Sequence, residues 1–152
     1  MLGARKNSLV LLLILGVVAG CHVGQIHKLN DDTSSVAPAA NMKVARSVHT
    51  ATLLPNGDVL IAGGMNSNES YSDTVEIYSP ATNTFRSVQS MSARRVGHTA
   101  TLLPNGKVLL AGGYDGAYLA SAEIYDPGTG RFTPAGQMTR TRSDHVAVLL
   151  NT

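Results

Sequence analysis

The sequence contains a single cysteine and no tryptophan, and few of its residues are aromatic (5%) or charged (14%). One cysteine excludes an intrachain disulfide framework and a zinc site built from several cysteines. The charged fraction lies below the roughly 25% of an average globular chain. Because 43% of the residues are hydrophobic, a disordered, highly charged tail protein is also excluded. Glycine is abundant by contrast, with 15 among 152 residues.

The formal charge of +2 comes from the first twenty residues, where Arg5 and Lys6 are the only charged side chains. The rest of the chain is neutral, which disfavours a nucleic-acid partner because binding to phosphates requires positive charge. Residues 9–19 form an apolar run of eleven residues, too short for a bilayer core that needs about 20 helical residues. A positive start followed by a short apolar run predicts a secretory signal peptide over residues 1–20.

The end of this segment, Val18-Ala19-Gly20-Cys21, resembles the lipobox of bacterial lipoproteins. The resemblance implies cleavage before Cys21 and acylation of its thiol, which would anchor the protein in a membrane of the cell envelope. The alternatives are an ordinary signal peptide followed by a chance cysteine, or an uncleaved anchor. His22 stands where an aspartate would resemble an inner-membrane retention signal, which favours the outer membrane or cell surface. Residues 21–41 lack sustained periodicity and are predicted to form a flexible tether.

From Met42 onward the sequence is a tandem repeat. The nonapeptide HTATLLPNG occurs at residues 49–57 and again at 98–106. An Arg-x-x-His motif occurs three times, with its histidines 49 and then 47 residues apart, and Gly-Gly, Glu-Ile-Tyr and a phenylalanine follow in both units. The repeat divides the chain into units at residues 42–90 and 91–137 and the start of a third at 138–152.

Each unit is predicted to contain four short β-strands. Residues 49–54 lead to Asn56-Gly57, a two-residue turn with positive φ and a strong hairpin signal. Residues 59–62 form a continuous apolar strand, which predicts cover on both faces of the sheet. Residues 74–78 alternate in polarity, and residues 84–88 supply the fourth strand. No segment beyond residue 20 has a helical period, so the fold class is all-β.

Four-stranded units of about 47 residues whose second strand ends in Gly-Gly resemble the kelch repeat of β-propellers. The resemblance covers residues 42–152 and implies two complete blades plus the start of a third. Phe85 and Phe132 stand where kelch blades usually carry tryptophan. Because propellers close with about 4–8 blades, we expect an incomplete propeller that is part of a longer one. The alternative is a ring of several copies, formed by self-association through open blade edges.

Two groups of residues contain the residue types of a metal site or a catalytic triad, but the spacing within each group argues against that function. His49, His98 and His145 share one repeat position, but zinc needs all its ligands within about 2.1 Å, and adjacent blades would hold them farther apart. We expect no metal or cofactor, and we assign these histidines to backbone hydrogen bonds at a strand end. Ser143, Asp144 and His145 include triad residue types, but neighbours along a strand point to opposite faces. No catalytic residues are therefore predicted.

The loop after Gly-Gly differs between the units, with MNSNESYSD at residues 65–73 and YDGAYL at 114–119. Variable loops of repeat proteins often form the binding face. Side chains in these loops can stack on a protein or carbohydrate ligand or hydrogen-bond to it, and the candidate ligand-binding residues are Asn66, Asn68, Tyr71, Tyr114, Asp115 and Tyr118. The alternative is that these residues only form solvated turns.

The nonapeptide is also similar to the propeller of galactose oxidase, an enzyme whose copper site uses tyrosines, histidines and a cysteine-modified tyrosine. Cys21 lies at the signal junction, and none of the five tyrosines stands in a matching motif; Tyr78 and Tyr125 occupy repeat positions and are assigned to the core. We therefore predict a lipid-anchored, non-catalytic scaffold of the cell envelope that binds a protein or a carbohydrate. The alternative is an N-terminal fragment of a galactose oxidase-like copper oxidase whose active site lies beyond residue 152.

Overall fold

A computed structural model describes residues 11–12, 25–29 and 36–150 of the chain. Cys21, the other lipobox residues and most of the predicted signal peptide lie outside this part. Every regular element in the described residues is a strand, which confirms the all-β prediction. The described residues include no helix that is long and apolar enough to cross a lipid bilayer.

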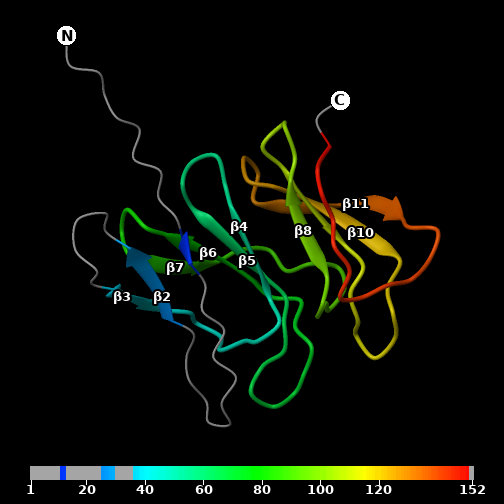
Figure 1. Cartoon of the computed structure of the whole chain (residues 1–152), viewed down its shortest axis with the longest axis horizontal. Helices are drawn as coiled ribbons and strands as arrows, with labels where there is room; N and C mark the ends of the chain where they lie inside the picture. Colours follow the sequence, from blue (N-terminus) through cyan, green and yellow to red (C-terminus); the bar gives the residue numbers. More distant parts are fainter. Residues whose placement is uncertain (1–10, 13–24, 30–35, 151–152) are drawn as a thin grey trace.

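Two four-stranded antiparallel sheets follow one another along the chain (Figure 1). In both sheets the strands pair in sequence order, so each sheet is a meander. We refer to the sheets as blade 1 and blade 2; their first strands, β4 and β8, lie against each other. Blade 1 consists of β4 (Thr50–Leu53), β5 (Val59–Ala62), β6 (Val75–Ser79) and β7 (Thr84–Ser87), and blade 2 of β8 (Thr99–Leu102), β9 (Val108–Ala111), β10 (Ser121–Asp126) and β11 (Arg131–Gln137).

The two blades share an apolar core between their facing sides. Blade 1 contributes Leu60 and Ile77, and blade 2 contributes Val108, Leu110 and Tyr125, each at most 1% exposed. The strand β5 is buried along its whole length, as a continuous apolar strand requires when both of its faces are covered. Apolar burial between blades therefore holds the repeat units together.

The tyrosine of each Glu-Ile-Tyr motif packs against the phenylalanine of the fourth strand. The ring centroids of Tyr78 and Phe85 are 4.8 Å apart, and those of Tyr125 and Phe132 are 4.9 Å apart. Burial raises the pKa of both tyrosine hydroxyls. These two tyrosines belong to the core, as their repeat positions predict.

The hairpin turn between the first two strands differs in detail from the prediction. Gly57 N donates to Leu54 O at 2.9 Å, so Pro55 and Asn56 occupy the two central positions of the turn. Gly57 alone has a positive φ, of 87°, and the side chain of Asn56 accepts a hydrogen bond from the backbone N–H of Asp58. The proline extends the turn by one residue because its ring fixes a φ suited to the first central position.

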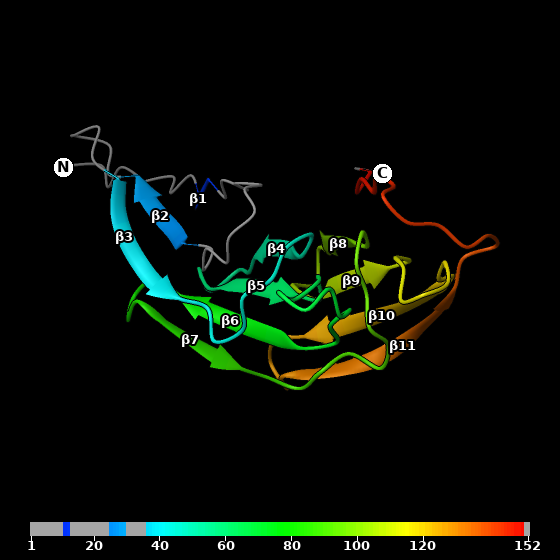
Figure 2. The same cartoon turned by 90° about the horizontal axis from the view of Figure 1, so that it is seen from below.

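The outer face of blade 1 is covered by part of the segment that was predicted to be a flexible tether. There β3 (Val36–Asn41) pairs with β2 (Gln25–Leu29), which also pairs with β1 (Leu11–Leu12), and Figure 2 shows this sheet beside blade 1. Ala39 and Ala40 pack on the apolar cluster of that face, and Ala40 N donates to Asn83 Oδ1 at 2.9 Å. This segment thus differs from the expected flexible tether. β3 is ordered because it packs on the apolar face of blade 1, and local periodicity of its sequence plays no part in this.

Each blade contains a buried ion pair that ties its leading loop to its third strand. Arg95 Nη2 lies 2.9 Å from Glu123 Oε1, with side-chain exposures of 0% and 4%, and Arg46 forms the same pair with Glu76 at 2.7 Å. The Arg95 guanidinium also donates to Gly112 O and Ser121 O. These bonds satisfy a charge that would otherwise be costly to bury. The Arg-x-x-His motif is therefore a structural element of each blade.

The Gly-Gly pairs connect neighbouring units through the backbone. The second glycine of blade 1, Gly64, donates its N–H to Arg95 O at 2.8 Å, and Gly113 donates to Arg142 O at 2.9 Å. A Cβ atom built on Gly63 would lie 2.5 Å from Arg95 O, which is closer than real Cβ atoms approach a carbonyl. Glycine is required here because the next unit comes this close to the backbone.

Candidate functional site

The meander brings four separate segments of the chain to one end of the sheets. In an antiparallel meander the connection after the second strand and the connection after the fourth strand emerge at the same end. The β5–β6 connection, the β9–β10 connection, the β7–β8 connection and the segment after β11 are therefore neighbours. The two variable loops lie among them, so the topology itself gathers the predicted ligand-binding loops.

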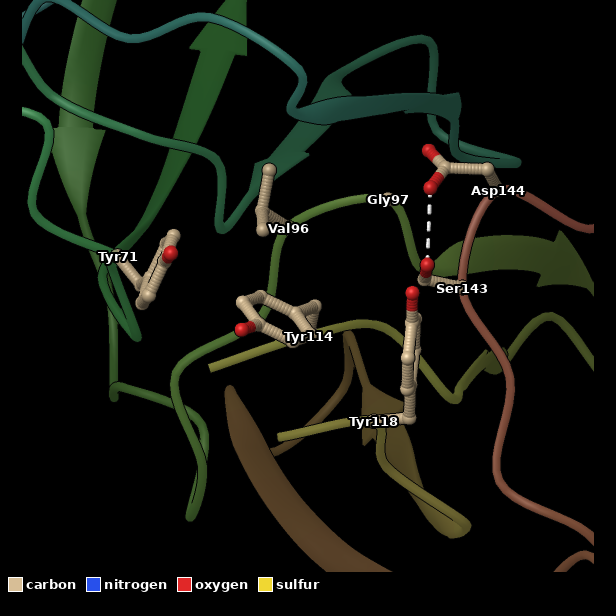
Figure 3. Close-up of a pocket in the computed structure, with 7 residues that line it drawn as sticks. All are labelled: Tyr71, Val96, Gly97, Tyr114, Tyr118, Ser143 and Asp144. Carbon is tan, nitrogen blue, oxygen red and sulfur yellow. Dashed lines mark hydrogen bonds between the residues drawn. The ribbon is translucent and has the colours of Figure 1, made fainter. Parts of the chain in front are cut away.

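Three tyrosines from these loops form a row of contacting rings (Figure 3). Tyr114 is in the middle: its ring centroid lies 5.5 Å from that of Tyr71 at an interplanar angle of 86°, and 5.3 Å from that of Tyr118 at 65°. Backbone bridges fix the row, since Tyr114 pairs with both Val96 and Tyr118. Tyr118 is 61% exposed, and the other two tyrosines are partly buried.

These rings line an open pocket of about 280 Å³. Its volume lies just below the 300–1,000 Å³ typical of ligand pockets, so it suits a small ligand or one group of a larger one. The residues that line the pocket come from both blades and from the segment after blade 2, and they are Tyr71, Val96, Gly97, Tyr114, Tyr118, Ser143 and Asp144.

Asp144 supplies the carboxylate of the pocket. Its backbone N–H donates to Gly97 O at 2.8 Å, and its Oδ2 accepts a hydrogen bond of 2.8 Å from Ser143 Oγ. A Cβ atom at Gly97 would lie 2.6 Å from Asp144 Oδ1, so the carboxylate can occupy this place only because residue 97 is glycine. Asp144 has a φ of 53°, a conformation that aspartate tolerates better than most residues do.

The structure brings together three of the six predicted ligand-binding residues, namely Tyr71, Tyr114 and Tyr118. Asn66, Asn68 and Asp115 do not line the pocket. Asn66 Oδ1 accepts hydrogen bonds from the backbone of residues 68 and 70, and Asp115 Oδ1 accepts one from residue 117. These two side chains shape their own loops, as in the alternative of turn-forming residues, and Asn68 is exposed.

Four lining residues were missed by the sequence reasoning: Val96, Gly97, Ser143 and Asp144. They precede the histidines of the second and third repeat units and lie 47 residues apart in pairs. The available signal was the variability of the residue just before each histidine, which is Val48, Gly97 or Asp144. All three have positive φ, so this position is a fixed turn at which the side chain varies.

Two of the three repeat histidines contact a threonine of the preceding unit. His98 Nε2 lies 2.9 Å from Thr50 Oγ1 of blade 1, and His145 Nε2 lies 3.2 Å from Thr99 Oγ1 of blade 2. The contact therefore links neighbouring units through side chains. No group of three metal-binding side chains is found among the residues that the structure describes.

Burial lowers the pKa of all three rings, and that of His98 falls to about 4, helped by the nearby Arg95 charge. These imidazoles are neutral at pH 7, and those of His98 and His145 link neighbouring units. His145 points its ring to Thr99, while Ser143 donates to Asp144. The three consecutive residues therefore do not form a nucleophile, base and orienting acid in line.

Comparison with known proteins supports this architecture. A family model described as the Kelch motif matches residues 46–92 and 94–139, which is more than half of the chain. Among solved structures, one titled "Structure of YjhT" aligns with a TM-score of 0.64 and 17% sequence identity over 76% of this chain. The alignment covers 46% of that protein, so the chain spans just under half its length. No curated protein matches the chain.

Proposed function

The chain belongs to the kelch-repeat family, and from its geometry we propose that it is a non-catalytic binding scaffold of the cell envelope. It takes its ligand, part of a protein or a carbohydrate, in the tyrosine pocket at the junction of the two blades. The observation that carries this proposal is the convergence of Tyr71, Tyr114 and Tyr118 on one pocket. Their partly exposed rings offer large rigid surfaces of the kind that binding sites favour.

The side chains around the pocket support binding rather than catalysis. The hydroxyl of Ser143 is directed to the carboxylate of Asp144, and the nearest repeat histidine, His145, contacts Thr99 instead. The group within hydrogen-bond reach of the Ser143 hydroxyl is thus the Asp144 carboxylate and not the imidazole of a serine–histidine pair.

The attachment to a membrane rests on the sequence, because Cys21 lies outside the described residues. Two or more acyl chains are needed for stable anchoring, and the lipobox resemblance implies such a modification. An anchor at Cys21 would hold the blades at the surface of an envelope membrane, with the outer membrane or cell surface favoured by His22.

The proposal is tested by probing arrays of oligosaccharides and peptides with the full chain and two variants. Tyr118→Ala removes an exposed ring from the pocket, whereas Asn68→Ala removes an exposed side chain from the neighbouring loop and serves as the control. We expect the array signals to be lost with Tyr118→Ala and kept with Asn68→Ala. Signals that survive Tyr118→Ala, or that both variants reduce equally, would place the binding site elsewhere.

A further inference from the structure

We infer that the group recognised by the tyrosine pocket is an alkylated ammonium ion, with trimethylammonium as the best fit. This inference rests on the proposed function and narrows it to one ligand chemistry.

The rings form a corner rather than a flat platform. Tyr114 meets Tyr71 at 86° and Tyr118 at 65°, so the ring surfaces open to the pocket face in different directions. A flat sugar ring stacks on one aromatic face at a time, whereas a compact, nearly spherical group can touch several faces at once. Perpendicular aromatic walls are the arrangement with which proteins hold quaternary ammonium ions.

The charge of the lining favours a cation. Of the seven lining residues, Asp144 alone carries a charge, and the three tyrosines present rings with negative faces. Two arginines directly precede lining residues: Arg95 is fully buried and paired with Glu123, and Arg142 is exposed and does not line the pocket. A cation is therefore attracted both by the carboxylate and by the rings.

The carboxylate is held in place before a ligand arrives. Ser143 Oγ donates to Asp144 Oδ2, and the backbone bond from Asp144 N to Gly97 O fixes the turn. The absence of a side chain at Gly97 provides the space in which the carboxylate lies. A fixed anion beside aromatic walls loses little conformational entropy on binding.

The test uses choline and its uncharged carbon analogue, in which a tert-butyl group replaces trimethylammonium. The two molecules have nearly the same shape, so a difference in affinity reports the charge. The chain has five tyrosines and no tryptophan, and three of the five line the pocket, so tyrosine fluorescence reports binding directly. The full chain is titrated in a detergent without a choline headgroup. We expect choline to bind at least about fivefold more tightly than the analogue.

Variants separate the contributions of charge and ring. Asp144→Asn keeps the side-chain shape and the tolerance for positive φ, and it should weaken choline binding about fivefold. The matched control Asp115→Asn removes an exposed carboxylate outside the lining and should leave the affinity unchanged. Tyr118→Leu should weaken binding about 2- to 30-fold, whereas Tyr114→Phe keeps the ring face and should change it less than twofold. Circular dichroism of each variant establishes that the sheets are intact.

The outcomes distinguish this inference from the proposed function. Equal affinity for choline and its uncharged analogue, or no binding of choline, overturns the inference, while array signals that depend on Tyr118 would leave the proposed function standing. Vesicles of phosphatidylcholine and of phosphatidylglycerol identify the source of the group. Competition of free choline with phosphatidylcholine vesicles assigns it to a lipid headgroup, and binding of choline alone assigns it to a soluble ligand; both results support the inference.

Discussion

His98 makes the stability of the two blades depend on pH. The residue is 6% exposed, and its Nε2 lies 2.9 Å from Thr50 Oγ1 across the junction between the blades. Burial and the Arg95 charge lower its pKa from 6.5 to about 4. Because the pKa in the folded state lies below the unfolded value, the unfolded chain binds the proton more tightly. The contribution of the neutral His98 ring to the free energy of unfolding is therefore fully present above about pH 6.5, and it is lost as the pH falls towards 4.

The magnitude follows from the difference between the two pKa values. A difference of about 2.5 pKa units corresponds to about 3 kcal/mol when the whole range is crossed. At pH 5, where the unfolded ring is protonated and the folded ring is mostly neutral, the loss relative to pH 7 is about 2 kcal/mol. That is a large part of the free energy of unfolding of an ordinary domain.

The variant His98→Gln isolates this effect. A glutamine amide reaches about as far as the imidazole and can still hydrogen-bond Thr50, but it does not titrate. Urea unfolding of the full chain and of the variant is followed by circular dichroism at pH 7, 6 and 5. The free-energy difference between the two proteins should shift by about 2 kcal/mol in favour of the variant between pH 7 and pH 5. The other histidines are present in both proteins, so their contributions cancel.

Parallel losses of stability in the two proteins would refute this reasoning. An independent check is an NMR titration of the His98 ring, which should show a midpoint near pH 4. A midpoint near 6.5 would mean that the ring is not held in a buried site between the blades.

Three further predictions concern stability and attachment. Arg95→Met should lower the free energy of unfolding in urea by about 3–5 kcal/mol because it leaves Glu123 buried without its partner. Lys107→Met, which removes an exposed ion pair, should lower it by less than about 1 kcal/mol. Equal decreases in the two variants would contradict the assignment of the Arg95–Glu123 pair as buried. Val48→Gly should raise the free energy of unfolding by up to about 1 kcal/mol, since a β-branched residue at a φ of 52° is strained. A decrease in the free energy of unfolding would show that the contacts of the valine side chain outweigh this strain. Cys21→Ser should abolish labelling by a radiolabelled fatty acid and release the protein from membranes, and continued labelling would refute the proposed acylation site.

The sequence predicts the blades well because their signals are local and occur twice. Residues 59–62 were predicted as a continuous buried strand, and β5 has the same bounds and is buried throughout. The fold of β3 could not be predicted in this way. Its cover of blade 1 depends on contacts such as that between Ala40 and Asn83, which are 43 residues apart, and its own sequence has neither a strand period nor a turn signal.

The candidate site was predicted only in part for a related reason. Variability of the loop after Gly-Gly pointed to the segments that carry Tyr71, Tyr114 and Tyr118, since loops are less constrained by packing than the elements they connect. Tyr71 and Tyr118 themselves stand at the same repeat position, five residues before the glutamate of Glu-Ile-Tyr. Asp144 was not predicted as a pocket residue because the position of its carboxylate depends on Gly97, which is 47 residues earlier in the chain. A pattern within one repeat unit does not contain that contact.

The positions that link the units and the positions that give the pocket its cation-binding character are separate within the repeat. The residues that link units recur: the arginine and histidine of each leading loop, and the Gly-Gly pair that meets the next arginine carbonyl. Tyr71 and Tyr118 occupy equivalent repeat positions, as do Ser47 and Ser143, but other lining positions differ between the units. Met65 follows Gly-Gly in blade 1 where Tyr114 does in blade 2, and Val48 precedes the first histidine where Gly97 precedes the second. A methionine in place of the central ring, and a valine where the carboxylate needs space, would remove both features that favour a cation. The pocket between the two blades and the segment after blade 2 therefore depends on substitutions at positions that the repeat framework leaves free to vary.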